Sequence, residues 1–191
     1  EQGLKEDHDV PAKRAWPLDF MAVTDHSEFM GVLNQLDDPS NPVSQLPASK
    51  KIMENPGSAY YFVRGNKKSN SPDTAAKFHV KEAMTSAWDQ EVAAANNNYE
   101  PGTFTTFVAY EWTALARGKY NLHRNVIFNS DHAPLPFSST DSNKPEDLWA
   151  YLDRARTNGI DVIAIPHNGN VSGGLMFDWN DSQNRTIDEH Y

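Results

Sequence analysis

Four short apolar runs mark the expected strands of this chain. They occupy residues 20–23, 107–109, 125–128 and 162–165. None of them alternates between apolar and polar side chains, which is the pattern of a strand with one face in water. Continuous apolar runs are typical of strands that are covered on both faces, as in an α/β sheet or barrel. The runs therefore predict an α/β fold with a buried sheet.

Helical patterns appear in two places, and one short helix is expected elsewhere. Apolar side chains recur at three- and four-residue steps over residues 73–96, which predicts the longest helix. A second helix is predicted from Lys144 to the stop signal Asn158-Gly159, directly before the last apolar run. A short helix is expected at 49–55, within an irregular, proline-containing excursion over residues 37–70.

The order of these elements predicts one domain with mostly parallel strands. The chain has 191 residues, which is within the usual length of a single domain, and its second helix leads at once into a strand. One pair of strands should differ. Only about ten residues lie between Glu111 and His123, fewer than the dozen or more that a parallel crossover needs. We therefore expect one antiparallel hairpin there.

Ionisable side chains stand at the ends of the four runs. Asp25 and His26 follow the first run, Glu111 follows the second and His167 follows the fourth, whereas His123 comes just before the third. Sites in parallel α/β folds are assembled at the carboxyl ends of strands. The hairpin would bring the start of the third strand to the same edge. The sequence therefore predicts a common rim carrying three histidines and a glutamate.

Imidazole and carboxylate groups in this combination suit zinc, manganese or iron. The chain has no cysteine, so a transition-metal site must be built from histidines and carboxylates. Simpler roles are open for each residue. A single histidine at a strand end is often a structural residue, Asp25 can cap a helix that starts at Ser27 or orient the His26 ring, and Glu111 can pair with a nearby arginine.

Composition narrows the classes of partner. The net charge is −9 and no basic cluster exceeds two lysines, which argues against binding to duplex nucleic acid. A phosphorylated small molecule is compatible with an acidic chain if metal cations supply the positive charge. No apolar stretch is long enough for a membrane span, and the first residues are too polar for a signal peptide. A cytoplasmic location, or a periplasmic or secreted one after removal of a leader, stays open, as does homo-oligomerisation.

A glycine-rich loop follows His167. Asn168 and Gly169 begin it, and its backbone N–H groups could bind an anion, although turn formation explains the same residues. The signature motifs of α/β hydrolases, of P-loop proteins and of zinc proteases with a His-Glu-x-x-His helix are missing from the sequence.

Three segments resemble motifs of the PHP (polymerase and histidinol phosphatase) superfamily. The segment from Leu18 to Glu28, which contains Thr24-Asp25-His26, resembles its second motif. Glu111 followed by His123-Arg124-Asn125 resembles its bridging glutamate and third-motif histidine, and Pro166-His167-Asn168 resembles a later histidine motif. The ordered set, from about Trp16 to Phe177, is most similar to a PHP-like family labelled only as a domain of unknown function.

The resemblance implies a distorted (β/α) barrel that hydrolyses phosphoesters with up to three metal ions. By it, His26 ligates one ion, Glu111 bridges two, and His123 and His167 complete the ligand set. We interpret residues 1–191 as lacking the first and the last metal-binding motif of the superfamily, His-x-His and Asp-x-His; no His-x-His occurs in the sequence. The chain is also shorter than the roughly 250 residues of a full barrel. We therefore interpret residues 1–191 as a single PHP-like domain that forms part of a longer protein and of a partial barrel.

The sequence thus predicts a metal-dependent hydrolase, with phosphoesters as the expected substrates. Arg124 and Asn168 are predicted to contact the substrate, because each adjoins a predicted ligand and offers hydrogen-bond donors. Two alternatives stay open: an amide or lactone hydrolase of the amidohydrolase type, and a barrel without catalysis that serves as a binding or scaffold module. Metal content separates the scaffold from both enzymes.

Overall fold

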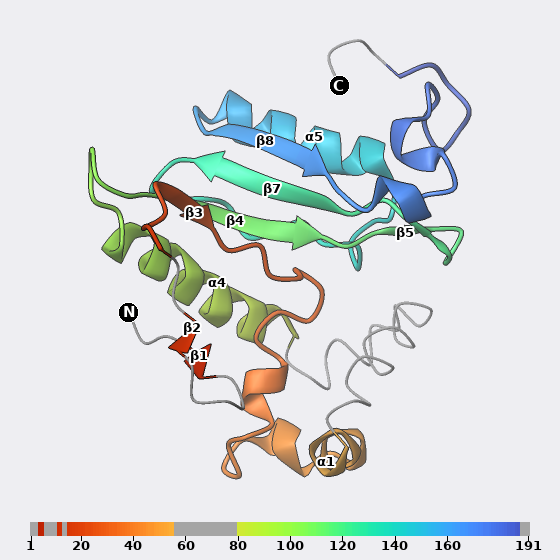
Figure 1. Cartoon of the computed structure of the whole chain (residues 1–191). Coiled ribbons are helices and arrows are strands. Elements are labelled where there is room, and N and C mark those ends of the chain that lie inside the picture. The colour runs from red at the N-terminus through yellow and green to blue at the C-terminus, as the bar shows by residue number, and fades with distance from the viewer. Residues whose placement is uncertain (1–3, 6–10, 13–14, 56–79, 188–191) are drawn as a thin grey trace.

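The fold is built on a four-stranded mixed sheet with the strand order β3-β4-β7-β8 (Figure 1). The computed structural model describes residues 4–5, 11–12, 15–55 and 80–187. The strands of the sheet are β3 (Phe20–Ala22), β4 (Thr105–Trp112), β7 (Arg124–Asn129) and β8 (Asp161–Pro166). All four contain the apolar runs, so the predicted strands of this sheet are confirmed.

The strand directions correct the prediction of a mostly parallel sheet. Only β3 and β4 are parallel, whereas β7 is antiparallel to both β4 and β8. The reason is the segment 130–144, which runs back along the sheet before the following helix begins. At its start the carbonyl of Asp131 accepts from Asn96, next to the start of β4, and at its end Asn143 accepts from Leu115, beyond the end of β4. This extra reversal makes β8 antiparallel to β7.

One consequence of these directions supports the predicted rim. Because β7 runs opposite to its two neighbours, β3, β4 and β8 all point the same way. Their carboxyl ends and the amino end of β7 therefore lie at one edge of the sheet. A short antiparallel pair, β5 (Leu115–Ala116) and β6 (Tyr120–Asn121), extends the predicted hairpin between β4 and β7.

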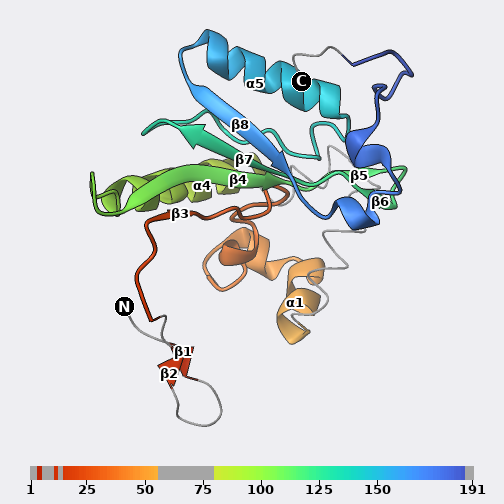
Figure 2. The same ribbon diagram turned by 45° about the horizontal axis from the view of Figure 1, so that its top comes forward.

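Two helices cover one face of the sheet. α4 (Val80–Asn97) runs along β4, and α5 (Pro145–Thr157) runs along β7 and β8 (Figure 2). Alternate side chains of the strands enter the core with them. The buried cluster includes Trp88, Val108, Tyr110, Trp112, Val126, Phe128, Leu148, Leu152 and Val162. Both predicted helices are confirmed, although the predicted start at residue 73 lies outside the described residues.

The other face of the sheet is partly bare. Phe20 of β3 is 66% exposed, and Ile163 and Ile165 of β8 are 54% and 46% exposed. The prediction that these strands are covered on both faces is therefore wrong for the described chain. The apolar runs place apolar side chains on both faces of these strands, but the described helices α4 and α5 cover only one face of the sheet. No barrel closure is seen among the described residues.

Residues 29–54 pack beside α4 and contain the 3-10 turns Leu33–Gln35 and Pro42–Gln45 and the helix α1 (Pro47–Glu54). The two-residue strands β1 (Leu4–Lys5) and β2 (Pro11–Ala12) pair with each other and lie apart from α4 (Figure 2). α1 confirms the short helix predicted at 49–55. A second small core joins this region to α4 through Phe29, Val32, Leu36, Val43, Ile52 and Ala83. Among the described helices, none has the length and apolar character that crossing a membrane requires.

Candidate metal centre

The edge of the sheet where the strand ends meet brings the four predicted ligands together. Glu111 lies near the end of β4, His123 directly precedes β7, and His167 directly follows β8. The backbone N–H of His167 donates to the carbonyl of His123, at 3.1 Å. His26 reaches the same edge because it forms a parallel bridge with Glu111. The hairpin between β4 and β7 thus brings His123 to the same edge of the sheet as Glu111, as predicted.

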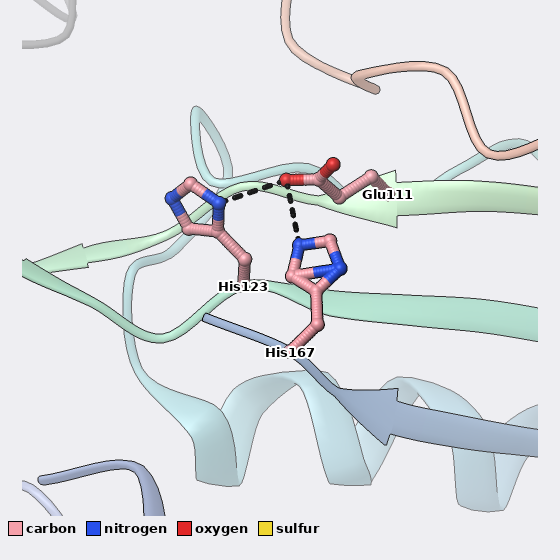
Figure 3. Close-up of side chains that lie close together, drawn as sticks. All are labelled: Glu111, His123 and His167. Carbon is pink, nitrogen blue, oxygen red and sulfur yellow. Dashed lines mark ion pairs between the residues drawn. The ribbon is translucent and has the colours of Figure 1, made fainter. Parts of the chain in front are cut away.

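One carboxylate oxygen is the centre of this cluster. Oε1 of Glu111 lies 2.9 Å from Nδ1 of His123 and 3.5 Å from Nε2 of His167 (Figure 3). Nδ1 of His26 is also 3.5 Å from the same oxygen. Glu111, His123 and His167 each offer one ligand atom, and these atoms all lie within 4.8 Å of one another. We call these three residues the Glu111 triad.

Burial separates the triad from His26. The side chains of Glu111 and His123 are 11% and 12% exposed, and that of His167 is 32% exposed. The His26 side chain is 65% exposed. The triad therefore forms the inner part of the centre, and His26 lies at its mouth. Figure 3 shows the two triad imidazoles pointing from neighbouring strands toward the Glu111 carboxylate.

Electrostatics keep the central carboxylate ionised. Burial on its own would raise the pKa of the Glu111 carboxyl. Hydrogen bonds from His123 and His26, together with the charge that these rings can carry, outweigh this effect and hold the pKa well below its ordinary value. Glu111 thus supplies a negative charge to the centre across the neutral range of pH. The alternative in which it pairs with an arginine is not seen in the described chain.

Two nitrogens of the triad are left without hydrogen bonds. Nε2 of His123 and Nε2 of His167 are both buried from solvent and make no hydrogen bond with any described residue, although His167 Nε2 lies within ion-pair distance of Glu111. Buried polar atoms of this kind are rare and call for an explanation such as an ion or a bound water. Two imidazoles and one carboxylate are a suitable donor set for zinc, manganese or iron. The residues present therefore fit a metal ion.

Thr113 and Glu28 support the centre and were not predicted from the sequence. The hydroxyl of Thr113 lies 2.6 Å from Nδ1 of His26 and donates to Oε1 of Glu111 at 3.1 Å. The buried Glu28 accepts from the backbone N–H of Thr113 and from that of Ser139, at 3.2 and 2.8 Å. Only weak features of the sequence point to these two residues. Thr113 is two residues after Glu111 and so faces the same side of the sheet, and Glu28 is the last residue of the segment around His26.

Asp25 does not orient the His26 ring in the described structure. Its backbone carbonyl accepts from Glu111 N–H, at 2.8 Å. The charge of its carboxylate adds to burial in raising the pKa of Glu91, a residue of α4. No helix starts at Ser27, so the capping role is not seen either. Thr113 takes the position that the sequence suggested for Asp25.

The two residues predicted to contact substrate lie in different places. Asn168 is exposed beside His167, with a positive φ of 57° that starts a 3-10 turn at Gly169–Val171. Arg124 pairs with Trp112, whereas Glu111 pairs with Asn125. Because successive residues of a strand face opposite sides, Arg124 points away from the triad. Asn168 thus adjoins a residue of the triad in the chain, whereas Arg124 lies on the other face of the sheet.

Comparison with known proteins gives a single family. A family model described as "Protein of unknown function (DUF3604)" matches residues 2–191. Neither the curated proteins nor the solved structures contain a match to the chain.

Proposed function

Because the chain belongs to the family DUF3604, whose description assigns no activity, we propose its function from its own residues: metal-dependent hydrolysis of ester bonds, with phosphoesters as substrates. The Glu111 triad holds the catalytic metal, and His26 completes the site from its mouth. The PHP resemblance of the three motif segments supports this assignment.

A single observation carries the proposal. Three imidazoles approach one buried carboxylate oxygen, within 2.9 to 3.5 Å. A purely structural histidine needs one hydrogen-bond partner, and three such residues on separate segments would not need to converge on one atom. Convergence of several nitrogens and a carboxylate is the arrangement that a zinc, manganese or iron ion requires.

Each residue of the centre has a distinct task in this proposal. Glu111 stays ionised and gives the site its negative charge, while His123 and His167 provide ring nitrogens from the adjacent strand ends. Thr113 fixes both Glu111 and His26, as a hydrogen-bonded outer partner does in many metal sites. When bound, the ion would lower the pKa of a water molecule and neutralise charge on the phosphoryl oxygens. The exposed His26 and Asn168 are the residues that a substrate would meet first.

The bare sheet face supports the finer proposal of a partial PHP-type barrel. Ile165 pairs with Asn125, and Asn125 pairs with Glu111, so Ile165 lies on the same face as the triad. Phe20 belongs to this face as well, through its pairing with Thr105. An apolar sheet face that leads to a metal site at the carboxyl ends of strands is the arrangement expected for a barrel interior.

Metal titration of the purified protein tests the function. We expect calorimetry to show stoichiometric binding of zinc or manganese. His123→Ala and His167→Ala should each weaken binding by at least about 100-fold, because loss of outer partners alone costs about 10- to 100-fold. His132→Ala is the matched control, since His132 is exposed and pairs with Asp131 away from the triad. This variant should bind as the unaltered protein does.

Hydrolysis assays separate the rival functions. Metal-dependent cleavage of bis(4-nitrophenyl) phosphate, lost in His167→Ala, is the expected result. Cleavage of an amide or lactone with no phosphoester activity would favour an amidohydrolase-like enzyme. Absence of metal binding would favour a non-catalytic binding module and contradict the proposal. Full metal load in both histidine variants would show that the ligand assignment is wrong.

A further inference from the structure

A second concave site lies on the helix side of the sheet. It is a cavity of about 1420 Å³ between the β5–β6 hairpin, the first turn of α5 and the 3-10 turn Leu175–Phe177. Most small-molecule sites have volumes of roughly 300 to 1,000 Å³, so a drug-sized ligand fits here. No residue of the Glu111 triad lines this cavity. It is therefore separate from the candidate metal centre.

The cavity is basic although the chain is acidic. Its lining contains four basic side chains, which are Arg117, Arg124, Lys144 and Arg156, and two acidic ones, Asp178 and Asp181. The net charge of the whole chain is −9. Asp181 is paired with Arg185, at 2.6 Å, and Arg156 is paired with Asp153, at 3.0 Å, which leaves Arg117, Arg124 and Lys144 against Asp178. The cavity thus offers an excess of positive charge to a ligand.

Arg124 is the buried cation of this site. It is only 6% exposed, and it donates to the carbonyls of Leu122 and Met176 at 2.8 and 3.3 Å. Its guanidinium lies 5.8 Å from the ring of Trp112 and 6.0 Å from that of Trp149. Within the described part of the chain, no carboxylate comes within ion-pair distance of it. Burial lowers the pKa of Arg124 to about 10, so it is charged at neutral pH.

An unneutralised buried cation is costly unless a ligand of opposite charge accompanies it. A guanidinium is suited to bind planar or tetrahedral oxyanions through paired N–H groups. Three aromatic rings are part of the lining: Trp149 is partly buried, and Phe177 and Trp179 are 72% and 85% exposed. Charge and aromatic surface thus occur together in one cavity.

We propose that this cavity binds an aromatic acid, meaning a flat apolar ring system that carries a sulfonate, phosphate or carboxylate group. The anionic group pairs with Arg124 and Lys144, and the ring system packs on Trp149 and Trp179. The site lies across β7 and β8 from the Glu111 triad, so it is a second binding site and not the proposed metal-dependent one. Its occupancy does not depend on metal, which allows a test in metal-free protein.

The test uses naphthalene-2-sulfonate as the probe, in calorimetric titrations of the whole protein with a chelator present. We expect saturable binding with one site per chain. Arg124→Met should weaken it about tenfold or more, the loss expected for a charge-assisted hydrogen bond. Arg154→Met is the matched control, because Arg154 is an exposed arginine of α5 that does not line the cavity. Its affinity should match that of the unaltered protein.

Lys144→Gln provides a second variant at an exposed position that should not disturb folding. It should weaken binding by about threefold, so the proposal is testable even if Arg124→Met does not fold. Naphthalene-2-ol and methanesulfonate, which carry only the ring or only the anion, should each bind more weakly than the probe. Absence of saturable binding, or equal affinities for the unaltered protein and both cavity variants, would overturn the proposal. Neither result would bear on metal binding at the triad.

Discussion

At the scale of single residues, Thr113 connects the buried Glu111 of the triad with the exposed His26 at the mouth of the metal centre. Its hydroxyl contacts both the exposed His26 and the buried Glu111, and Glu28 fixes its backbone. Glu111 and Thr113 face the same side of the chain because they are two residues apart. The Thr113 hydroxyl thus holds the Glu111 carboxylate in position, although Thr113 is not one of the proposed metal ligands.

Thr113→Val tests this role. Valine keeps the shape of threonine but cannot donate to Glu111, so we expect zinc affinity to fall by about 10- to 100-fold, as for other outer partners of metal ligands. Thr157→Val is the control, since the Thr157 hydroxyl bonds only to a carbonyl on the exposed end of α5. Calorimetry on both variants measures the difference. Unchanged affinity in Thr113→Val would show that the threonine does not position the ligands.

The sequence predicted the ligand positions better than their surroundings. Glu111 and the histidines were recognised because each ends or begins an apolar run, and strand ends are fixed in space by the sheet. Thr113 and Glu28 were missed because their hydrogen bonds join segments about 85 or more residues apart in the sequence. The side of the sheet that Arg124 faces was also missed, because it depends on the register between β4 and β7.

At the scale of elements, residues 29–32 pack against α4 directly after the segment that carries His26. Gly31 makes this contact possible. Its φ is +74°, and a Cβ there would lie 2.5 Å from the carbonyl oxygen of Ala83 and 2.8 Å from Cβ of Ala87. Only a residue without a side chain allows the segment to approach the helix this closely. The backbone directly after the segment that carries His26 is therefore held against α4 by a glycine.

Gly31→Ala should lower the free energy of unfolding by about 2 to 5 kcal/mol, from left-handed strain plus overpacking against the helix backbone. Gly102→Ala is a matched control, because Gly102 has a φ of +80° but no neighbouring atom within 4 Å of the place that a methyl group would take. It should cost only about 1 to 2 kcal/mol. Urea denaturation of both variants gives the comparison. Equal losses would mean that the close packing of Gly31 against α4 is not important.

The elements themselves were largely predictable, whereas the strand directions were not. The apolar runs and helical periods identified β3, β4, β7, β8, α4 and α5 because each is a local pattern. The direction of β8 depends on the return of segment 130–144, and that path is set by distant hydrogen bonds such as the one between Asn96 and Asp131. Polar and apolar patterns carry no information about such a reversal. The four predicted ligands nevertheless meet at the predicted edge of the sheet, because β3, β4 and β8 run in the same direction.

At the scale of the whole molecule, the two faces of the sheet have different roles. The helix face contains the main core and, beside it, the basic cavity around Arg124. The opposite face carries the Glu111 triad at its edge and leaves Phe20, Ile163 and Ile165 exposed. Adjacent residues of β7 contribute to both sides, since Arg124 faces the cavity while His123 precedes it in the triad. A metal and an aromatic acid would thus bind on opposite sides of the same strands.

Anomalous diffraction at the zinc absorption edge, on crystals of the protein grown with zinc, tests the central claim most directly. We expect one strong peak at the edge of the sheet, about 2.0 to 2.2 Å from a Glu111 carboxylate oxygen and from a ring nitrogen of both His123 and His167. A well-ordered structure with no peak at these residues, or with their side chains turned away from one another, would contradict it.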